Sequence, residues 1–438
     1  MDILSFIERK RDGGVHSPED LGEFVRRFSS GGIPDYQAAA WLMAVCFNGL
    51  SEDELRDFTL ALARSGKILS FGDDVFFTDK HSTGGVGDKV TLILVPLAAA
   101  CGTPVAKLSG RGLGFTGGTA DKLEAIPGFR THLPSDEFMR QAKTLGCAIS
   151  SHSADLAPAE ARFYALRDVT GTVPSMPLIC SSIVSKKIAG GAAGFVFDVK
   201  CGRGAFMQDY KAAEALAGAL VSLSRSLGRK AAALITGMDE PLGRWVGNAA
   251  EVLEAMEVLM GRGPADVREV TLALTGAMVS LSGDLSMEEG RALAEKKLDD
   301  GSALFMMKKL VEAQGGDGMV CGAPEKILTI APGTAFIKAE KKGTVEVIDA
   351  RGIGEGVKRL GGGRMTLDEK IDLSAAVRLA VKTGAEVEPG DPLLEIRYSS
   401  DVRLKDSLPH FERAFSVRED GPPAKEREKR GLVLGVVQ

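Results

Sequence analysis

Residues 80–124 read KHSTGGVGDKVTLILVPLAAACGTPVAKLSGRGLGFTGGTADKLE. This stretch predicts two glycine-rich loops, at 80–89 and 109–119, on either side of an apolar helix and a short strand. A β-rich run at 75–78 precedes the first loop, and the strand at 105–108 precedes the second. In a parallel sheet both loops would emerge at the carboxyl ends of strands, the edge where α/β folds bind their ligands.

The two loops combine glycine with charged and hydroxyl-bearing side chains. Glycine lets backbone N–H groups converge on a ligand, while Lys80, Ser82 and other Ser and Thr residues add charge and donors. The helix that opens near residues 88–91 presents its positive end to the first loop. This combination is typical of a site for an oxyanion such as phosphate.

The rest of the chain divides by pattern. Residues 1–66 read as helices only, with a capping box at 51–54. From about residue 71 strands and helices alternate, which favours a largely parallel sheet covered by helices. Two helices, at 158–169 and 177–189, interrupt this alternation. Beyond about residue 330 short β-runs and turns indicate a separate α+β domain.

Composition excludes several classes of protein. The 438 residues carry 54 basic and 59 acidic side chains, so a net charge of −5 gives no reason to expect a nucleic-acid or anionic-membrane partner. The longest apolar stretch, around 92–101, is far shorter than the roughly twenty residues that span a bilayer. The amino terminus does not resemble a signal peptide, and the six cysteines form no C-x-x-C. We expect a cytoplasmic protein with reduced thiols.

His81 is the one histidine of five that lies in a glycine-rich loop. The near-neutral pKa of an ordinary histidine suits a proton donor to a leaving group or a substrate carbonyl. Lys80 could neutralise a dianion and Ser82 could donate to it. The opposing interpretation is a surface turn with incidental charge.

The second loop contains a literal G-x-G-x-x-G at 112–117. As a dinucleotide fingerprint it is weak, because Pro127 and Gly128 come too early for a full crossover helix. No P-loop, HExxH, paired cysteines or G-x-S-x-G elbow occurs, so neither a catalytic metal nor a serine hydrolase is expected.

Arg167, Ser182 and Lys186 lie on the two interrupting helices. Ser182 and Lys186 are four residues apart and therefore share a helix face. Together an arginine, a serine and a lysine could bind the carbonyl oxygens and ring N–H of a planar heterocycle. A lysine pair alone is more typical of a solvated face.

Four motifs in this order carry a resemblance to a known family. The stretch at 109–124 resembles the signature of thymidine and pyrimidine-nucleoside phosphorylases, and KHSTGGVGD at 80–88 resembles their first phosphate loop. YALRDVT at 164–170 and SSIVSKK at 181–187 are similar to their base-binding helices. The resemblance extends over essentially the whole chain, including the C-terminal domain.

This resemblance implies a domain arrangement and an oligomeric state. A helical domain, 1–66 completed by about 160–193, is hinged to a mostly parallel-sheet α/β domain at 67–159 with 194–330. A C-terminal α+β domain follows at 331–438. The protein would be a homodimer through the helical domain, which carries the base site, and closure would bring the phosphate site of the α/β domain to it.

The implied reaction is reversible phosphorolysis of pyrimidine nucleosides to free base and (deoxy)ribose 1-phosphate, with inversion at C1′. Thymidine and deoxyuridine are the expected substrates and uridine a further candidate; phosphate is the co-substrate and no cofactor is required. By the matching motifs, the phosphate-binding residues would be Lys80, Ser82, Thr91, Lys107, Leu108, Ser109 and Thr119. The pyrimidine-binding residues would be His81, Arg167, Ser182 and Lys186. His81, Arg167 and Lys186 would be the catalytic residues, with His81 stabilising charge on the departing base.

Two positions depart from the family pattern. Phe115 stands where many relatives have histidine, so no polar role is assigned to it. Lys89 stands where potassium-binding relatives have threonine, although Gly87, Leu242 and Glu254 match the other positions of that ion site. We hypothesise that the Lys89 ammonium replaces the potassium ion and pairs with Glu254.

Three alternatives remain open on the sequence. A phosphoribosyltransferase of the anthranilate type resembles this fold but would need acidic residues for magnesium and pyrophosphate. AMP phosphorylase shares the motifs but usually carries an extra N-terminal domain, which is absent here. A non-catalytic scaffold on the same fold would not need intact phosphate and base motifs.

Overall fold

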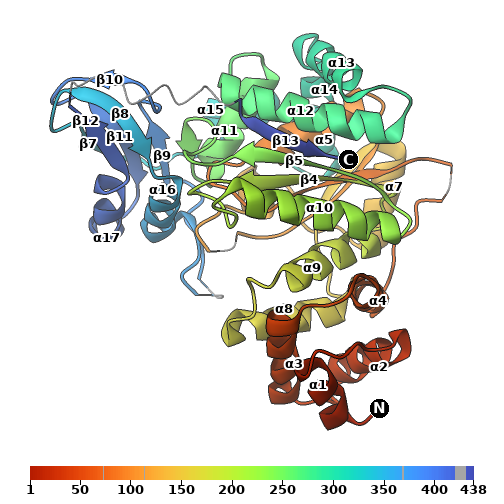
Figure 1. The fold of residues 1–438 in the computed structure, drawn as a ribbon. Helices are drawn as coiled ribbons and strands as arrows, with labels where there is room; N and C mark the ends of the chain where they lie inside the picture. The colour runs from red at the N-terminus through yellow and green to blue at the C-terminus, as the bar shows by residue number, and fades with distance from the viewer. Residues whose placement is uncertain (73, 113, 367–368, 420–430) are drawn as a thin grey trace.

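Six helices form the lower lobe of the molecule in Figure 1, where the amino terminus also lies. The computed structural model describes residues 1–72, 74–112, 114–366, 369–419 and 431–438. Four helices of the lobe come from the amino terminus and two from the middle of the chain: α1 (Ile3–Arg11), α2 (Pro18–Ser29), α3 (Asp35–Asn48), α4 (Glu52–Ala63), α8 (Pro158–Thr170) and α9 (Met176–Ala189).

Local chemistry explains where these helices begin, and aromatic packing holds them together. The Ser17 hydroxyl caps α2 and Pro18 occupies its first position, while Ser51 and Glu54 form a capping box at the start of α4. The Phe163 ring of α8 lies 5.6 Å from the Phe58 ring of α4, so the middle segment packs into the N-terminal core.

The central sheet has six strands in the order β13-β5-β4-β1-β2-β3. Neighbouring strands are parallel except for β13, which pairs antiparallel with β5. The strands are β1 (Thr78–Ser82), β2 (Val105–Ser109), β3 (Cys147–Ser151), β4 (Gly194–Cys201), β5 (Lys230–Gly237) and β13 (Val433–Val437).

Helices cover both faces of this sheet. Helix α10 (Tyr210–Ser226) lies below β4 and β5 in Figure 1, while α5 (Val90–Ala100) and α12 (Ala265–Ser282) lie above. Both faces carry clusters of buried apolar side chains, as is typical of a sheet buried on two sides. The other helices of this domain are α6 (Thr119–Leu123), α7 (Ser135–Leu145), α11 (Asn248–Leu259), α13 (Met287–Asp299), α14 (Ser302–Ala313), η1 (Gly318–Cys321) and α15 (Pro324–Ile327).

The first strand lies later in the sequence than its pattern indicates. The sequence predicted a strand at 75–78 and a loop from residue 80, whereas β1 spans Thr78–Ser82. Its charged side chains are buried because each meets an opposite charge: Asp79 lies 2.7 Å from Lys187, and Lys80 lies 2.8 Å from Asp198. In a sequence, charged residues like these indicate an exposed loop, because isolated charges are rarely buried.

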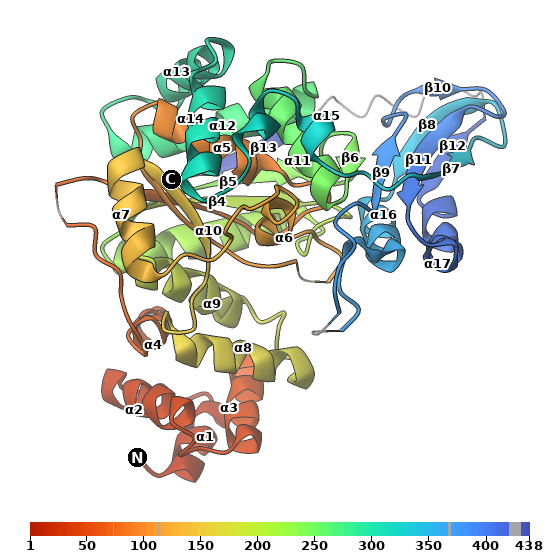
Figure 2. The same cartoon turned by 180° about the vertical axis from the view of Figure 1, so that it is seen from behind.

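The C-terminal domain, at the left of Figure 1, contains two small sheets. Seen from behind in Figure 2, the C-terminal domain again lies beside the α/β domain, and the helical lobe lies below the α/β domain. One sheet has the order β6-β9-β11-β7 and the other β10-β8-β12, and all their pairings are antiparallel. Its elements are β7 (Gly333–Lys338), β8 (Gly343–Ile348), α16 (Ala350–Val357), η2 (Lys358–Gly362), β9 (Ala376–Leu379), β10 (Glu386–Val387), β11 (Pro392–Tyr398), α17 (Asp401–Glu412) and β12 (Phe415–Arg418). The predicted class, a helical domain with a mostly parallel α/β domain and a C-terminal α+β domain, is confirmed.

The two sheet-bearing parts exchange strands. The short strand β6 (Trp245–Val246) leaves the α/β part to pair with β9. In return β13, which the sequence placed with residues 331–438, pairs with β5 at the edge of the central sheet. The C-terminal domain is therefore joined to the α/β domain at two separate places.

Among the described residues no single helix is long and apolar enough to cross a membrane. Helices α12 and α13 pass that test only as a pair, and they bend by 119° at their junction.

Candidate active site

Two lysines lie side by side at the carboxyl ends of β1 and β4, directly below the first glycine-rich loop. Lys80 and Lys200 place their Nζ atoms 2.8 and 2.9 Å from one oxygen of Asp198, and each lies 3.9 Å from Asp88. Each ammonium has three N–H donors and pairs with Asp198, so donors remain for a further acceptor. The Ser82 hydroxyl donates to Asp88 at 2.6 Å.

Opposite charges keep this buried group ionised. Burial alone would lower the pKa of Lys80, but Asp198 and Asp88 raise it above its ordinary value. Burial would likewise raise the pKa of Asp88, yet Lys200 and Lys80 hold it far below its usual range. The base of the loop thus holds ionised Lys80 and Asp88 side chains at neutral pH, with their opposite charges balanced.

The second glycine-rich loop faces the same edge of the sheet. Ser109 ends β2 and Thr119 begins α6, while Thr91 lies in the first turn of α5; the Ser109 and Thr91 residues are buried. The loop folds back tightly, since a Cβ atom at Gly118 would lie 2.1 Å from the backbone nitrogen of Gly112. Only glycine fits such a close backbone approach.

Lys107 and Leu108 lie behind the loops. The Lys107 ammonium donates to the backbone oxygens of Lys80 at 2.8 Å and Leu108 at 3.0 Å, and it lies 3.7 Å from Asp79. Lys187 donates to Asp79 at 2.7 Å and also reaches the Leu108 oxygen. Burial, followed by repulsion from Lys187, lowers the pKa of Lys107 to about 7. Lys107 therefore links the strands that carry the two loops.

The three residues predicted to hold a heterocycle are brought together by α8 and α9. Lys186 lies 2.8 Å from Glu160 and donates to the Ser182 hydroxyl at 3.0 Å, and Ser182 in turn donates to Glu160. The Lys186 ammonium lies 5.5 Å from the Tyr164 ring centroid, and the Arg167 guanidinium carbon 5.9 Å from it. The helix face formed by Glu160, Tyr164 and Arg167 thus meets Ser182 and Lys186.

Arg167 has a second task that the sequence did not indicate. Its guanidinium donates to the backbone oxygens of Val173 and Leu178, each at 2.8 Å, and more weakly to that of Thr172. These bonds fix the connection between α8 and α9. Burial lowers the pKa of Arg167 from its ordinary value, with Glu160 opposing the shift.

His81 lies on β1, next to Lys80 in the sequence and within electrostatic range of Lys186. Burial lowers its pKa well below the ordinary value, and the positive charges of Lys187, Lys107, Lys186 and Lys80 lower it further. The sequence-based expectation of a near-neutral pKa is therefore wrong for His81. The His81 imidazole is neutral at pH 7, so it can donate one N–H but carries no charge.

Sequence reasoning missed Lys200, Glu160 and His152. Lys200 ends a strand and is followed by Gly202 and Gly204, which repeats the pattern of the predicted loops and could have been noticed. Glu160 lies seven residues before Arg167, so helical spacing could have found it. His152 follows β3, and burial and the nearby charges of Lys187, Lys186 and Lys107 lower its pKa well below the ordinary value.

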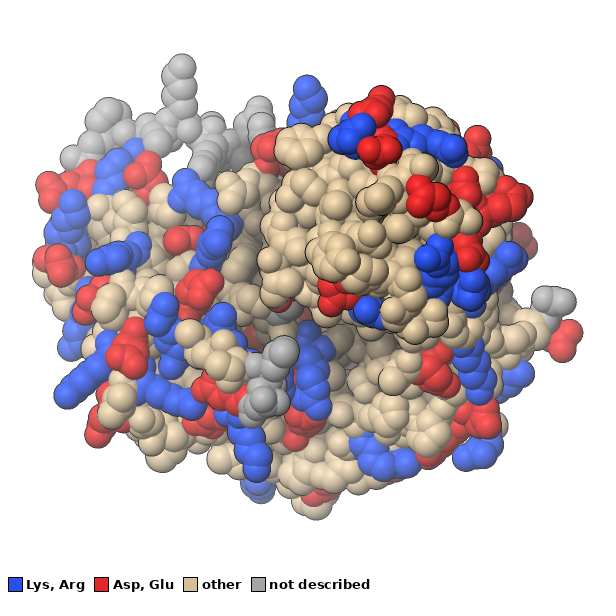
Figure 3. Space-filling view, turned by 90° about the horizontal axis from the view of Figure 1, so that it is seen from below, with Lys and Arg blue, Asp and Glu red and all other residues tan. Residues whose placement is uncertain are grey.

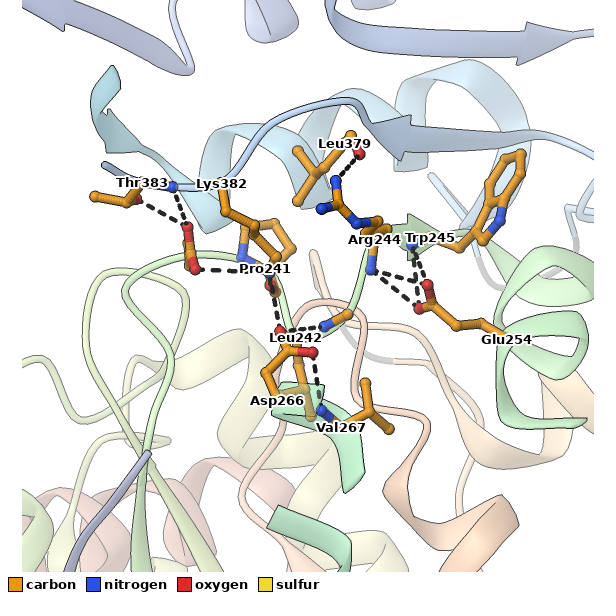
Figure 4. A network of polar contacts seen from close by, with 12 residues as sticks. Pro241, Leu242, Arg244, Trp245, Glu254, Asp266, Val267, Leu379, Lys382 and Thr383 are labelled. Atoms are coloured by element: carbon orange, nitrogen blue, oxygen red, sulfur yellow. Dashed lines mark hydrogen bonds and ion pairs between the residues drawn. The ribbon is translucent and has the colours of Figure 1, made fainter. Parts of the chain in front are cut away.

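Lys89 is buried beside the loop that follows β5. Its ammonium donates to the backbone oxygens of Leu242 at 3.0 Å and Trp245 at 2.8 Å, and it pairs with the Glu254 carboxylate. Figure 4 shows that Glu254 also accepts from the backbone nitrogens of Arg244 and Trp245. The cation is thus surrounded by oxygen atoms, and the predicted pairing of Lys89 with Glu254 is present.

Comparison with known proteins agrees with this geometry. Residues 4–66 match the Glycosyl transferase family, helical bundle domain, and residues 74–304 match the Glycosyl transferase family, a/b domain. Residues 344–418 match the Pyrimidine nucleoside phosphorylase C-terminal domain. The chain is 44% identical to the pyrimidine-nucleoside phosphorylase of Staphylococcus haemolyticus, an alignment covering 95% of this chain and 96% of that protein.

The chain belongs to the pyrimidine-nucleoside phosphorylase family. A second member, from Geobacillus stearothermophilus, is 45% identical over 93% of this chain and 94% of its own. The resemblance inferred from the four motifs is thereby confirmed, and the pyrimidine-nucleoside phosphorylase family is a family of pentosyltransferases.

A solved structure shares the fold at lower similarity. The anthranilate phosphoribosyltransferase from Thermus thermophilus superimposes with a TM-score of 0.59 and 19% identity, covering 72% of this chain and 99% of that one. At this identity the likeness concerns the fold alone. It gives no support to the anthranilate-type alternative over the pyrimidine-nucleoside phosphorylase family.

Proposed function

We propose that this protein catalyses the reversible phosphorolysis of pyrimidine nucleosides. The observation that carries the proposal is that His81 lies within electrostatic range of two groups of residues on different domains. On one side Lys80 and Lys200 offer ammonium protons below a glycine-rich loop; on the other Ser182 and Lys186 form a buried polar cluster with Glu160. The first suits phosphate and the second suits a pyrimidine.

The residues divide the reaction as follows. Phosphate, held by Lys80, Ser82 and the second loop, attacks C1′ from the face opposite the base. The C1′–N1 bond breaks and its electron pair passes to the pyrimidine ring, while a phosphate oxygen bonds to C1′. Lys186 and the neutral His81 donate to the base carbonyl oxygens, where negative charge develops. Holding the phosphate against C1′ supplies much of the remaining rate enhancement.

One assay tests this proposal. The protein is incubated with thymidine, deoxyuridine, uridine, cytidine or AMP, with and without inorganic phosphate, and base release is followed. We expect release from thymidine, deoxyuridine or uridine that requires phosphate. Release from AMP alone would favour AMP phosphorylase, and no phosphate-dependent release from any pyrimidine nucleoside would exclude the proposed activity.

We also propose a homodimer formed through the helical domain. Three large apolar side chains of α3 are exposed at helical spacing, Tyr36, Met43 and Phe47, with exposed fractions of 73%, 37% and 81%. Figure 3 views the helical domain from below and shows a broad area of this lobe without charged residues at its centre. An exposed apolar face of this kind supports association with a second copy.

We further propose that the Lys89 ammonium takes the place of a potassium ion. Two backbone oxygens and the Glu254 carboxylate surround the ammonium, a set of oxygen ligands that also suits a monovalent cation. With a covalently attached cation in this position, the enzyme needs no added potassium.

A further inference from the structure

The C-terminal domain contacts the second glycine-rich loop through a partly buried ion pair. The Arg364 guanidinium lies 2.9 Å from one oxygen of Asp121, the third residue of α6. The other oxygen of Asp121 accepts the backbone N–H of Gly112 at 2.6 Å. The Arg111 guanidinium lies 3.0 Å from the same Asp121 oxygen that Arg364 contacts. Asp121 therefore ties the start of the loop to its end, and Arg364 supplies a second counter-charge, from the neighbouring domain.

A second contact from the same domain reaches the tip of the loop. The Arg351 guanidinium of α16 lies 5.2 Å from the Phe115 ring centroid. The α16 backbone approaches so closely that a Cβ atom at Gly354 would lie 2.5 Å from the Phe115 oxygen. Phe115 also lies 5.9 Å from the ring of Phe206, which borders Gly84 of the first loop. Phe115, to which the sequence assigned no polar role, thus packs against both the first loop and the C-terminal domain.

Other contacts already hold the two domains together. Figure 4 shows Lys382 donating to the Pro241 oxygen and to Asp266, while Arg244 donates to the Leu379 oxygen. These contacts join the C-terminal domain to residues 241–266, and the β6–β9 pairing joins the two domains as well. Arg364 is therefore not required simply to attach the domain.

We propose that the C-terminal domain positions the second glycine-rich loop for phosphate, with Arg364 as the positioning residue; this inference rests on the proposed function. Glycine-rich backbone loses much conformational freedom when it is ordered around a ligand. A contact that orders the loop before phosphate arrives reduces the conformational entropy lost on binding, so phosphate binds more tightly. Arg364 acts through Asp121 and does not touch the substrate.

The test compares Arg364→Met with Lys382→Met, a matched control at the same domain boundary. We expect Arg364→Met to raise the KM for phosphate about tenfold, as the loss of a charge-assisted hydrogen bond predicts, while the KM for thymidine and kcat stay near wild type. Hydrogen exchange in the peptide covering 109–119 should quicken without any ligand. Lys382→Met should change neither the KM for phosphate nor the exchange rate of this peptide. Arg364→Lys should bind phosphate more tightly than Arg364→Met, because it keeps a positive charge at this position.

A double-mutant cycle with Asp121→Asn separates positioning from general support. The double variant should be no worse for phosphate than Asp121→Asn alone, because Asp121→Asn already removes the carboxylate charge with which both Arg364 and Arg111 pair. The inference is overturned if Arg364→Met and Lys382→Met raise both KM values alike, or if exchange in 109–119 does not change. Hydrogen exchange needs no turnover, so failure of the proposed activity would be recognised separately, as absent phosphorolysis by the wild-type protein.

Discussion

Lys186 is held ready for a ligand without being locked into the core. Glu160 and Ser182 orient its ammonium, and a quarter of its side chain, 25%, remains exposed. Burial lowers the pKa of Lys186, while Glu160 opposes the shift. A single charged donor can thus face an incoming carbonyl oxygen with little further ordering.

We predict that Lys186→Ala lowers kcat/KM for thymidine by about 100-fold or more, as expected when a charged donor to the developing negative charge is removed. The thermal unfolding midpoint should fall modestly, because the buried Glu160 carboxylate loses its ammonium partner but keeps the Ser182 hydroxyl as a donor. Arg167→Ala should lose both activity and stability, since three backbone oxygens would lose their donor. Steady-state kinetics and circular dichroism melts distinguish the two; wild-type turnover in Lys186→Ala would remove this residue from the base site.

Lys107 should make the stability of the protein depend on pH. Its pKa is about 7 in the folded protein, lowered from 10.5, so the unfolded chain binds more protons between these values. The destabilisation caused by Lys107 is therefore greatest below pH 7 and fades as the pH rises toward 10.5. The free energy of unfolding of Lys107→Met, relative to that of the wild type, should therefore increase by roughly 2–3 kcal/mol as the pH falls from 9.5 to 6. Urea titrations of both proteins at the two pH values check this; a constant difference would contradict it.

Lys89 should make potassium unnecessary. We predict equal activity and equal unfolding midpoint in potassium and sodium chloride for the wild type. Lys89→Met should be destabilised by about 3–5 kcal/mol, because Glu254 would remain buried without its cation. Lys89→Thr, which leaves room, should be less stable in sodium than in potassium. Potassium-dependent activity of the wild type would be the contrary result.

At the scale of an element, α3 has two faces with different partners. Ala38, Trp41, Leu42 and Val45 are buried within the helical domain, whereas Tyr36, Met43 and Phe47 are exposed. An unpaired apolar helix face is costly in water, and a second copy of the chain is the occupant we propose for it.

We predict that Phe47→Glu shifts the protein from dimer to monomer at micromolar concentration. A charge placed at the centre of a symmetric interface would meet its own copy and would also have to be dehydrated. Analytical ultracentrifugation of wild type and variant gives the measurement. Val402→Glu on α17 is a suitable control, because Val402 is 70% exposed on the C-terminal domain. Identical sedimentation of Phe47→Glu and wild type would argue against this face as the interface.

At the scale of the whole molecule, exchanged strands join the domains. Strand β13 covers the outer edge of β5, and β6 extends the sheet of the C-terminal domain. An uncovered edge strand exposes unpaired backbone groups that promote aggregation. The end of the chain is thus part of the central sheet.

We predict that removing residues 431–438 lowers the unfolding midpoint by several degrees, since a domain of this size shifts by about 2–4 °C per kcal/mol. The shortened protein should also aggregate more readily on warming, because the β5 edge is exposed. Differential scanning fluorimetry with light scattering measures both effects. If neither the midpoint nor the scattering changes, β13 contributes little to the sheet.

Apart from the first part of the 80–89 loop, which is strand β1, the sequence by itself determined the glycine-rich loops, the helix starts and the family. These depend on local chemistry: a capping box needs residues three apart, and a tight glycine turn needs only its own backbone. The motifs at 80–88 and 109–124 therefore located the edge of the sheet for which we propose phosphate binding, and Ser182 and Lys186 located the polar cluster on the helical domain.

Only the tertiary structure decided how distant charges are paired. Lys80 and Lys200 share Asp198 across two strands, and Lys89 meets Glu254 across 165 positions of sequence. Such pairs turned a charged segment into the buried strand β1, moved the pKa of His81 and Lys107 away from their ordinary values, and joined Arg364 to Asp121. The physical reason is that burial and electrostatic energy depend on distances in space, and separation along the chain does not specify those distances.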